Sequence, residues 1–202
     1  MKRAAIGVRM HSGWGALVAV ADNAGTVEIV DRRRIALTSP GARGGNQPYH
    51  FAKSLELAEA EKFLGGYFAA SQDLALKSVQ GLVSQLDDRY RVTGSAILLA
   101  SGRPLPTLSK ILSSHSLIHT AEGEFFREAF SKACESLNLP VTGLRERHLD
   151  ERVQVTFGKA ATQISQQISD LGHSVGPPWT RDQKMAALAA LVVLANDRGD
   201  SR

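Results

Sequence analysis

The sequence predicts an α/β protein whose mixed sheet is covered by helices on both faces, and two observations predict it. First, three apolar, β-rich runs lie within residues 4–37, joined by two tight turn signals, as in an antiparallel three-stranded meander. Second, segments with helical periodicity alternate with short apolar runs after residue 56, a pattern typical of buried parallel strands. The expected order is β-β-β-α-β-α-β-α-α, which forms one mixed sheet between helices.

The third strand carries an arginine triplet, Arg32 to Arg34, and period-2 alternation divides it between the two faces of the sheet. On this pattern alone, one face holds Val27, Ile29, Asp31 and Arg33, and the other holds Glu28, Val30, Arg32 and Arg34. The triplet is therefore not expected to form a single basic patch.

A glycine- and proline-rich loop is expected at 38–55, followed by one long helix over 56–86 that can kink at Gly65–Gly66. The apolar run 94–102 predicts a buried central strand. A helical pattern then covers 106–137. Thr120 is a good N-cap and can break this helix near His119.

In the last third of the chain, the pattern predicts a strand at 140–147 and a helix over much of 152–172. A turn should follow at "HSVGPPW", and Thr180 is the natural N-cap of a final helix. Residues after about 196 are expected to fray. With no linker or internal repeat, residues 1–202 are expected to form one domain.

Bulk composition excludes several classes of protein. The apolar share of 43% and the charged share of 22% are ordinary for a soluble globular chain. No apolar window reaches the roughly 18 residues of a membrane span, so no membrane partner is expected. Arg9 interrupts the apolar run of the N-terminus, which argues against a signal peptide and for a cytoplasmic protein.

Net charge and cysteine content limit the possible partners and the possible covalent chemistry. The net charge of +4 permits nucleic acid as a partner without requiring it. Cys134 is the only cysteine, which excludes an internal disulfide, and its helical setting predicts a buried, inert thiol. Nothing in the sequence identifies a cofactor.

The two ends of the chain carry a family resemblance. "IGVRMHSGWGALV" resembles the first hairpin of the ribonuclease H-like superfamily, nearest to the RuvC-type Holliday-junction resolvases, and "DQKMAALAALVVLA" resembles their last helix. The resemblance implies a ribonuclease H-like fold. It also implies a site where carboxylates from the first strand, the fourth strand and the last helix hold two divalent ions.

Most of those acids are missing here. Arg9 stands where the first strand should carry its acid, the fourth strand offers Ser101, and only Asp182 remains in the last helix. One carboxylate beside cationic side chains cannot hold two magnesium ions, so two-metal nuclease activity is not expected. The resemblance then implies a catalytically degenerate protein that acts as a nucleic-acid-binding or assembly module.

The first turn is a second candidate site. Backbone N–H groups of His11, Ser12 and Gly13 could bind a phosphate, with Arg9 and Ser101 beside them. The plainer interpretation is a bare glycine turn. A further alternative is a protein partner or homo-oligomer that assembles through the alanine-rich helix at 184–195.

A relocated metal site is the alternative to a degenerate protein. His115, His119 and Glu122 are spaced i, i+4 and i+7, which places them on one face of an unbroken helix. Two imidazoles and a carboxylate can bind zinc or iron, and Glu124 could then act as a base or support a ligand. If these residues bind a metal ion, the protein is expected to be a metal-dependent enzyme. If the helix breaks at Thr120, capping and packing explain these residues.

Two weaker candidates remain. His50 follows a polar loop and could contact a substrate, or simply lie on the surface. Glu146, with His148, Asp150 and Glu151, follows the fifth strand at the edge where open α/β sheets bind ligands. The neighbouring arginines also suit a salt-bridged, exposed edge.

Overall fold

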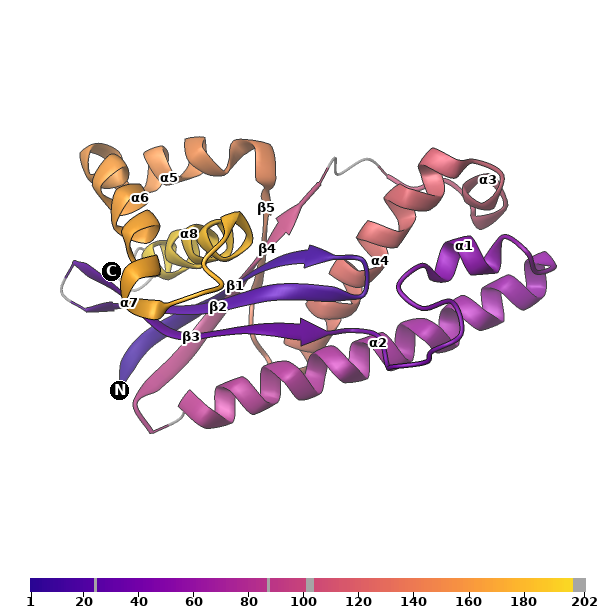
Figure 1. The fold of residues 1–202 in the computed structure, drawn as a ribbon, viewed down its shortest axis with the longest axis horizontal. Coiled ribbons are helices and arrows are strands. Elements are labelled where there is room, and N and C mark those ends of the chain that lie inside the picture. The colour runs from indigo at the N-terminus through magenta and orange to yellow at the C-terminus, as the bar shows by residue number, and fades with distance from the viewer. Residues whose placement is uncertain (24, 87, 101–103, 198–202) are drawn as a thin grey trace.

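The computed structural model describes residues 1–23, 25–86, 88–100 and 104–197, and its five strands form one mixed sheet (Figure 1). The strand order is β3-β2-β1-β4-β5. β1 pairs antiparallel with β2 and β2 with β3, while β1, β4 and β5 run parallel. The strands are β1 (Lys2–His11), β2 (Trp14–Asn23), β3 (Thr26–Ala36), β4 (Tyr90–Leu99) and β5 (Val141–Arg145). The predicted fold class is confirmed.

Helices cover both faces of this sheet (Figure 1). The long α2 and α4 lie on one face, and α5, α6 and α8 lie on the other. The helices are α1 (Pro48–Ala52), α2 (Leu57–Leu86), α3 (Leu108–Leu112), α4 (His115–Ser136), α5 (Leu149–Phe157), α6 (Ala161–Asp170), α7 (Gly172–Val175) and α8 (Arg181–Asn196), with 3-10 turns at Glu146–His148 and Gly158–Ala160. None of the helices in the described part of the chain is long and apolar enough to cross a membrane.

β1 is buried on both faces, and its small residues let α8 approach closely. Ile6 and Val8 belong to the core under α2 and α4, whereas Ala5 belongs to the core under α8. A Cβ on Gly7 would lie 1.8 Å from the carbonyl oxygen of Ala186, so the backbones of β1 and α8 are nearly in contact. This contact fixes the start of α8 near the carboxyl end of β1.

The same close packing rules out one expected interface. Every residue of α8 from Ala186 to Leu194 is buried within the chain's own core. The prediction that the alanine-rich segment 184–195 serves as an assembly surface is therefore wrong, because the sheet already covers it.

A β-bulge changes the predicted faces of β3. Val20 pairs with Ile29 but Ala19 pairs with Asp31, so Val30 is an extra residue in the ladder. Beyond the bulge, Asp31 and Arg33 lie on the face of α2, not with Val27 and Ile29 as predicted. Arg32 lies on the face of α8. The split of the arginine triplet is confirmed, while the companions assigned to each arginine are wrong.

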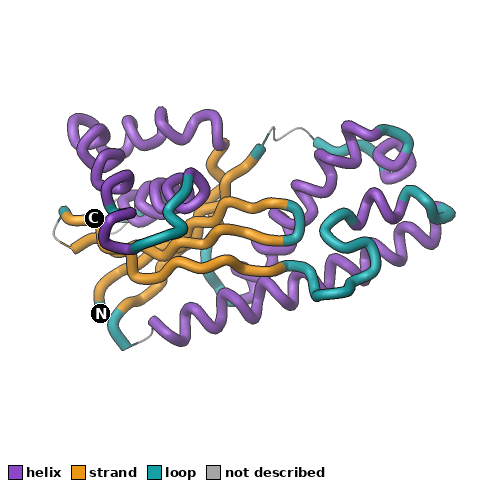
Figure 2. The backbone as a smooth tube through the Cα atoms, in the orientation of Figure 1, coloured by secondary structure: helices purple, strands orange, loops and turns teal. Residues whose placement is uncertain are grey.

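The segment expected to be a loop at 38–55 contains the short helix α1, which starts with Pro48 at its first position. The preceding loop lies beside the end of the first hairpin (Figure 2), where Asn46 is close to Gly13. Leu37 donates its backbone N–H to the carbonyl of Gly13 at 2.9 Å. α2 runs from Leu57 to Leu86 without a break at Gly65–Gly66.

The helical region 106–137 is interrupted earlier than predicted. The break lies at Ser113–Ser114, between α3 and α4. Thr120 lies inside α4 and donates its hydroxyl to the carbonyl of Ser116 at 3.0 Å, so it does not cap a new helix.

The region predicted as one helix over 152–172 is also divided. Helix begins earlier, at Leu149, and Gly158 ends α5 with a φ of 53°, a conformation that favours glycine. α6 follows, and α7 occupies part of the expected turn. Residues 198–202 of the expected frayed tail lie outside the described residues.

The buried thiol of Cys134 is the basis for a first chemical prediction. Burial raises the pKa of the Cys134 thiol to about 12, so almost no thiolate forms near neutral pH. We expect Cys134 in the folded protein to resist alkylation by iodoacetamide at pH 8. In about 6 M guanidinium chloride the thiol should react fully, and mass spectrometry measures both results. Rapid labelling of the folded protein would contradict this burial.

Candidate functional site

Near the carboxyl end of β1, Arg9 forms ion pairs with Glu146, which directly follows β5, and with Asp182 in the first turn of α8. Figure 1 shows these three elements of the fold. Thr180 positions the turn: its hydroxyl accepts the N–H of Asp182 at 3.3 Å, and the Gln183 side chain accepts the N–H of Thr180 at 2.9 Å. This capping box confirms Thr180 as the N-cap. It also fixes Asp182 beside β1.

Arg9 connects the two acids of this edge. Its Nε donates to Glu146 Oε2 at 3.1 Å and its Nη2 to Glu146 Oε1 at 2.9 Å, a bidentate pair. Its Nη1 donates to Asp182 Oδ1. The side chains of Arg9 and Asp182 are only 21% and 19% exposed, so solvent screens this pairing less than at an open surface.

Further contacts occupy the remaining carboxylate oxygen. His11 Nε2 lies 2.9 Å from Asp182 Oδ2, and Arg181 Nη2 lies 3.4 Å from Glu146 Oε1. All four carboxylate oxygens of the two acids therefore contact an arginine or histidine nitrogen. We name Arg9, Glu146, Asp182, His11 and Arg181 the Arg9 network.

The network also acts on the acid–base properties of Arg9. Burial lowers the pKa of Arg9, but the hydrogen bonds that Arg9 donates to Glu146 and Asp182, and the negative charge of these two acids, outweigh burial, so this pKa lies above its ordinary value. Arg9 is therefore a permanent cation at the centre of the site.

An aromatic stack borders the network. The His11 ring lies parallel to the Trp14 ring, with centroids 4.3 Å apart, and the guanidinium of Arg34 lies 3.9 Å from the Trp14 centroid. The indole is thus in contact with the imidazole of His11 on one side and with the guanidinium of Arg34, a cation–π contact.

The structure brings the sequence candidates Arg9, His11 and Asp182 together. Ser12 and Gly13 form the two-residue turn of the first hairpin, with Gly13 at a φ of 78°. Asn46 packs on this turn, since a Cβ on Gly13 would lie 2.3 Å from Asn46 Oδ1. Ser101 lies outside the described residues.

Glu146 was only a weak candidate in the sequence, yet it supplies half of the acidic groups. The signal that could have found it is its place directly after β5, at the same sheet edge as the end of β1. Its partner could not be read from the sequence, because Arg9 lies 137 residues away.

The predicted histidine site is only partly as expected. His115 and His119 lie together on α4, but their third neighbour is His50 from α1, not Glu122. Glu122 lies deeper and binds His50, because it is one further turn along the same helix face. Glu124 lies away from this cluster and pairs with Arg127 at 3.0 Å.

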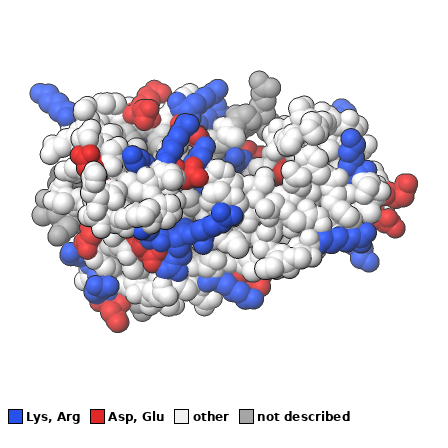
Figure 3. All heavy atoms as spheres, viewed as in Figure 1, with Lys and Arg blue, Asp and Glu red and all other residues white. Residues whose placement is uncertain are grey.

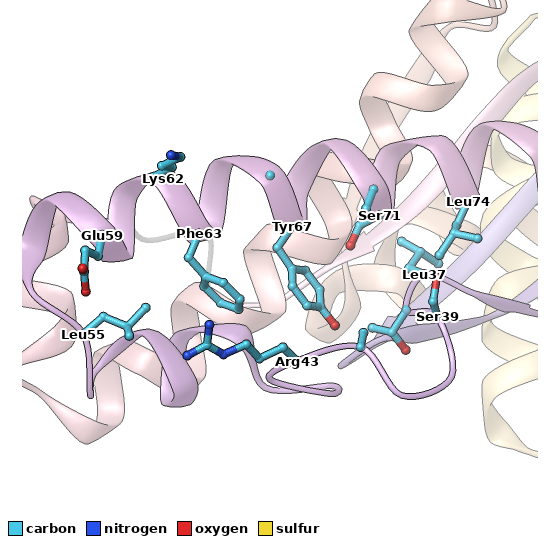
Figure 4. Close-up of a pocket in the computed structure, with 14 residues that line it drawn as sticks. Leu37, Ser39, Arg43, Leu55, Glu59, Lys62, Phe63, Tyr67, Ser71 and Leu74 are labelled. Atoms are coloured by element: carbon cyan, nitrogen blue, oxygen red, sulfur yellow. The ribbon is translucent and has the colours of Figure 1, made fainter.

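A groove of about 750 Å³ lies elsewhere, between α2 and the residues that follow β3 (Figure 4). Phe63, Tyr67 and Leu74 from α2 face Leu37 and Arg43 across it. Tyr67 donates its hydroxyl to the carbonyl of Gly45, and burial raises the pKa of Tyr67. No residue of the Arg9 network or of the histidine cluster lines this groove.

Charge on the visible face is mixed. Figure 3 shows Lys and Arg side chains interspersed with Asp and Glu on this face, without one broad basic patch. Near the Arg9 network, exposed arginines occur on β3, at the last residue of β5, just after β5 and at the start of α8. They are Arg34, Arg145, Arg147 and Arg181.

No family model matches the chain, and no curated protein matches its sequence. Solved structures do match. A structure of Thermus thermophilus RuvC is 13% identical, with 98% of this chain and 96% of that chain covered and a TM-score of 0.52. T. thermophilus RuvC in complex with Holliday junction substrate is 12% identical, with coverages of 98% and 97% and a TM-score of 0.56. The chain therefore has the ribonuclease H-like fold of RuvC, which confirms the resemblance at the level of the fold.

Proposed function

We propose that this protein is a nucleic-acid-binding module with the fold of RuvC, in which the Arg9 network takes the place of the metal site. The observation that carries the proposal is the contact of all four oxygens of Asp182 and Glu146 with Arg9, His11 or Arg181. A metal ion would have to displace the guanidinium of Arg9 to reach them.

Charge supports the same conclusion. Two magnesium ions bring four positive charges, and carboxylate ligands must offset them. In the described part of the site, Asp182 and Glu146 are balanced by Arg9 and Arg181, and β4 from Tyr90 to Leu99 contains no acid. These residues do not fit a two-metal centre, so the proposed role is binding without metal-dependent cleavage.

Nucleic acid is the partner that the surroundings of the network favour. One of the similar RuvC structures is a complex with Holliday junction substrate. In this protein, exposed arginines surround the carboxyl edge of the sheet, and the Arg181 side chain is 75% exposed; the others are Arg34, Arg145 and Arg147. Arginine forks bind phosphate bidentately, so this rim suits a phosphate backbone.

The test is fluorescence anisotropy with labelled four-way junction, duplex and single-stranded DNA at several salt concentrations. We expect binding whose log K falls linearly with log salt. A triple variant, Arg145→Ala, Arg147→Ala and Arg181→Ala, should weaken binding roughly tenfold at low salt and make the salt slope shallower by about two to three.

The matched control removes three positive charges elsewhere. Lys62→Ala, Lys77→Ala and Lys132→Ala change exposed lysines on α2 and α4, and their salt slope should equal that of the wild type. No binding to any DNA at low salt, or equal losses in the two triple variants, would overturn the proposal.

A further inference from the structure

Three imidazoles lie together where α1 contacts the start of α4. Candidate ligand nitrogens of His50, His115 and His119 all lie within 4.8 Å of one another. His115 Nε2 and His119 Nε2 are 3.1 Å apart. The His50 ring centroid lies 4.8 Å from that of His119 and 5.4 Å from that of His115.

Helix geometry and packing hold the three rings in place. α4 begins at His115 and is continuous through His119, so these side chains are one turn apart on the same face. α1 brings His50 against them and is anchored by Tyr49, whose ring packs edge-on against Phe125 with centroids 5.8 Å apart. The cluster thus rests on two packed helices.

Glu122 lies directly behind His50. It is 1% exposed, and its Oε1 accepts the backbone N–H of His50 at 3.2 Å and lies 3.0 Å from His50 Nδ1. A buried carboxylate is costly without such partners. When Nδ1 donates to Glu122, Nε2 of His50 keeps its lone pair free for a ligand. Histidines that bind metals are held in this way by a carboxylate on the other ring nitrogen.

We propose that His50, His115 and His119 bind a divalent transition-metal ion, with zinc as the expected ion. Zinc–nitrogen bonds of about 2.0–2.1 Å in a tetrahedron separate two ligand nitrogens by about 3.3 Å, close to the His115–His119 separation of 3.1 Å. Imidazole ligands suit zinc, copper, nickel and iron, whereas magnesium prefers oxygen. Three protein ligands leave the fourth position to water or to a small ligand.

Glu122 is a positioning residue in this proposal, and the bound ion would join α1 to α4. The loop before α1 packs through Asn46 on the hairpin turn at Gly13. The ion that joins α1 to α4 would therefore also connect α4, through this loop, to the end of the sheet. Zinc should therefore stabilise the whole chain against unfolding, by mass action on the folded state.

The experiment titrates metal-free, full-length protein with Zn²⁺ by calorimetry and follows its Tm, with Co²⁺ absorption as a spectroscopic check. We expect one ion per chain and a higher Tm in the wild type. His119→Ala should lose both effects, and His173→Ala, which removes an exposed histidine outside the cluster, should keep them. No saturable binding by the wild type, or equal losses in the two variants, would overturn the proposal.

A second variant tests the role of Glu122. Glu122→Gln should lower the zinc affinity about 10- to 100-fold. The Tm of the metal-free variant should stay close to that of the metal-free wild type. An unchanged zinc affinity would contradict the positioning role. His115→Ala gives an independent measure of the site, because His115 is exposed and not required for the core.

Discussion

Replacing Gly7 with alanine is expected to destabilise the protein by about 3 kcal/mol, at the upper end of overpacking substitutions. The added Cβ would lie 1.8 Å from the Ala186 carbonyl oxygen and 2.8 Å from its carbon. Both atoms belong to the backbone of α8, so no side chain can rotate away. α8 must shift from β1, and the Arg9–Asp182 pair should loosen with it. Urea denaturation gives the free energy of unfolding.

Gly81→Ala is the matched control. Gly81 lies inside α2, in its last third, and a Cβ there would meet no atom within 4 Å. Alanine should therefore raise the free energy of unfolding by about 0.5–1 kcal/mol through its better helix propensity. If Gly7→Ala were as stable as the wild type, the close approach of α8 to β1 would be wrong.

Arg9→Asp should convert the Arg9 network into a cation site. The substitution removes the guanidinium from Asp182 and Glu146 and adds a third carboxylate at the end of β1. We expect Mn²⁺ to bind this variant with a dissociation constant of about 0.1–1 mM, as at weak carboxylate sites, and not to bind this site in the wild type. Electron paramagnetic resonance of free Mn²⁺ measures the difference.

Arg34→Asp is the control for that substitution. It makes the same change of charge on the same sheet face, but on β3, which β2 separates from β1. Its Mn²⁺ binding should equal that of the wild type. Equal Mn²⁺ affinity in the wild type and in Arg9→Asp would show that the guanidinium does not keep cations out.

Local signals in the sequence predicted much of the fold. Tight turns and alternating apolar residues predicted the hairpin around Gly13 and the order of the elements, because both depend on short-range backbone preferences. Thr180 was recognised as an N-cap for the same reason. The resemblance implied an acid at the position of Arg9, and this expectation drew attention to the edge where the network lies.

What escaped prediction depends on contacts between distant residues. The bulge at Val30 has no glycine or proline to mark it and is defined only by the pairing of β2 with β3. Glu146 and His50 joined their clusters through tertiary packing, with partners 137 and 72 residues away in the chain. Thr120 had the residue type of a cap, but the packing of α4 kept it within the helix.

The most direct test of the proposed function is a cleavage assay on a labelled four-way junction that is saturated with wild-type protein, with Mg²⁺ or Mn²⁺ present. We expect the junction to be bound and to remain intact with either ion, because Arg9 occupies the carboxylates that would hold the metal. Metal-dependent cleavage that disappears in Asp182→Asn would contradict this result and would show that the Arg9 network opens to form a working nuclease site.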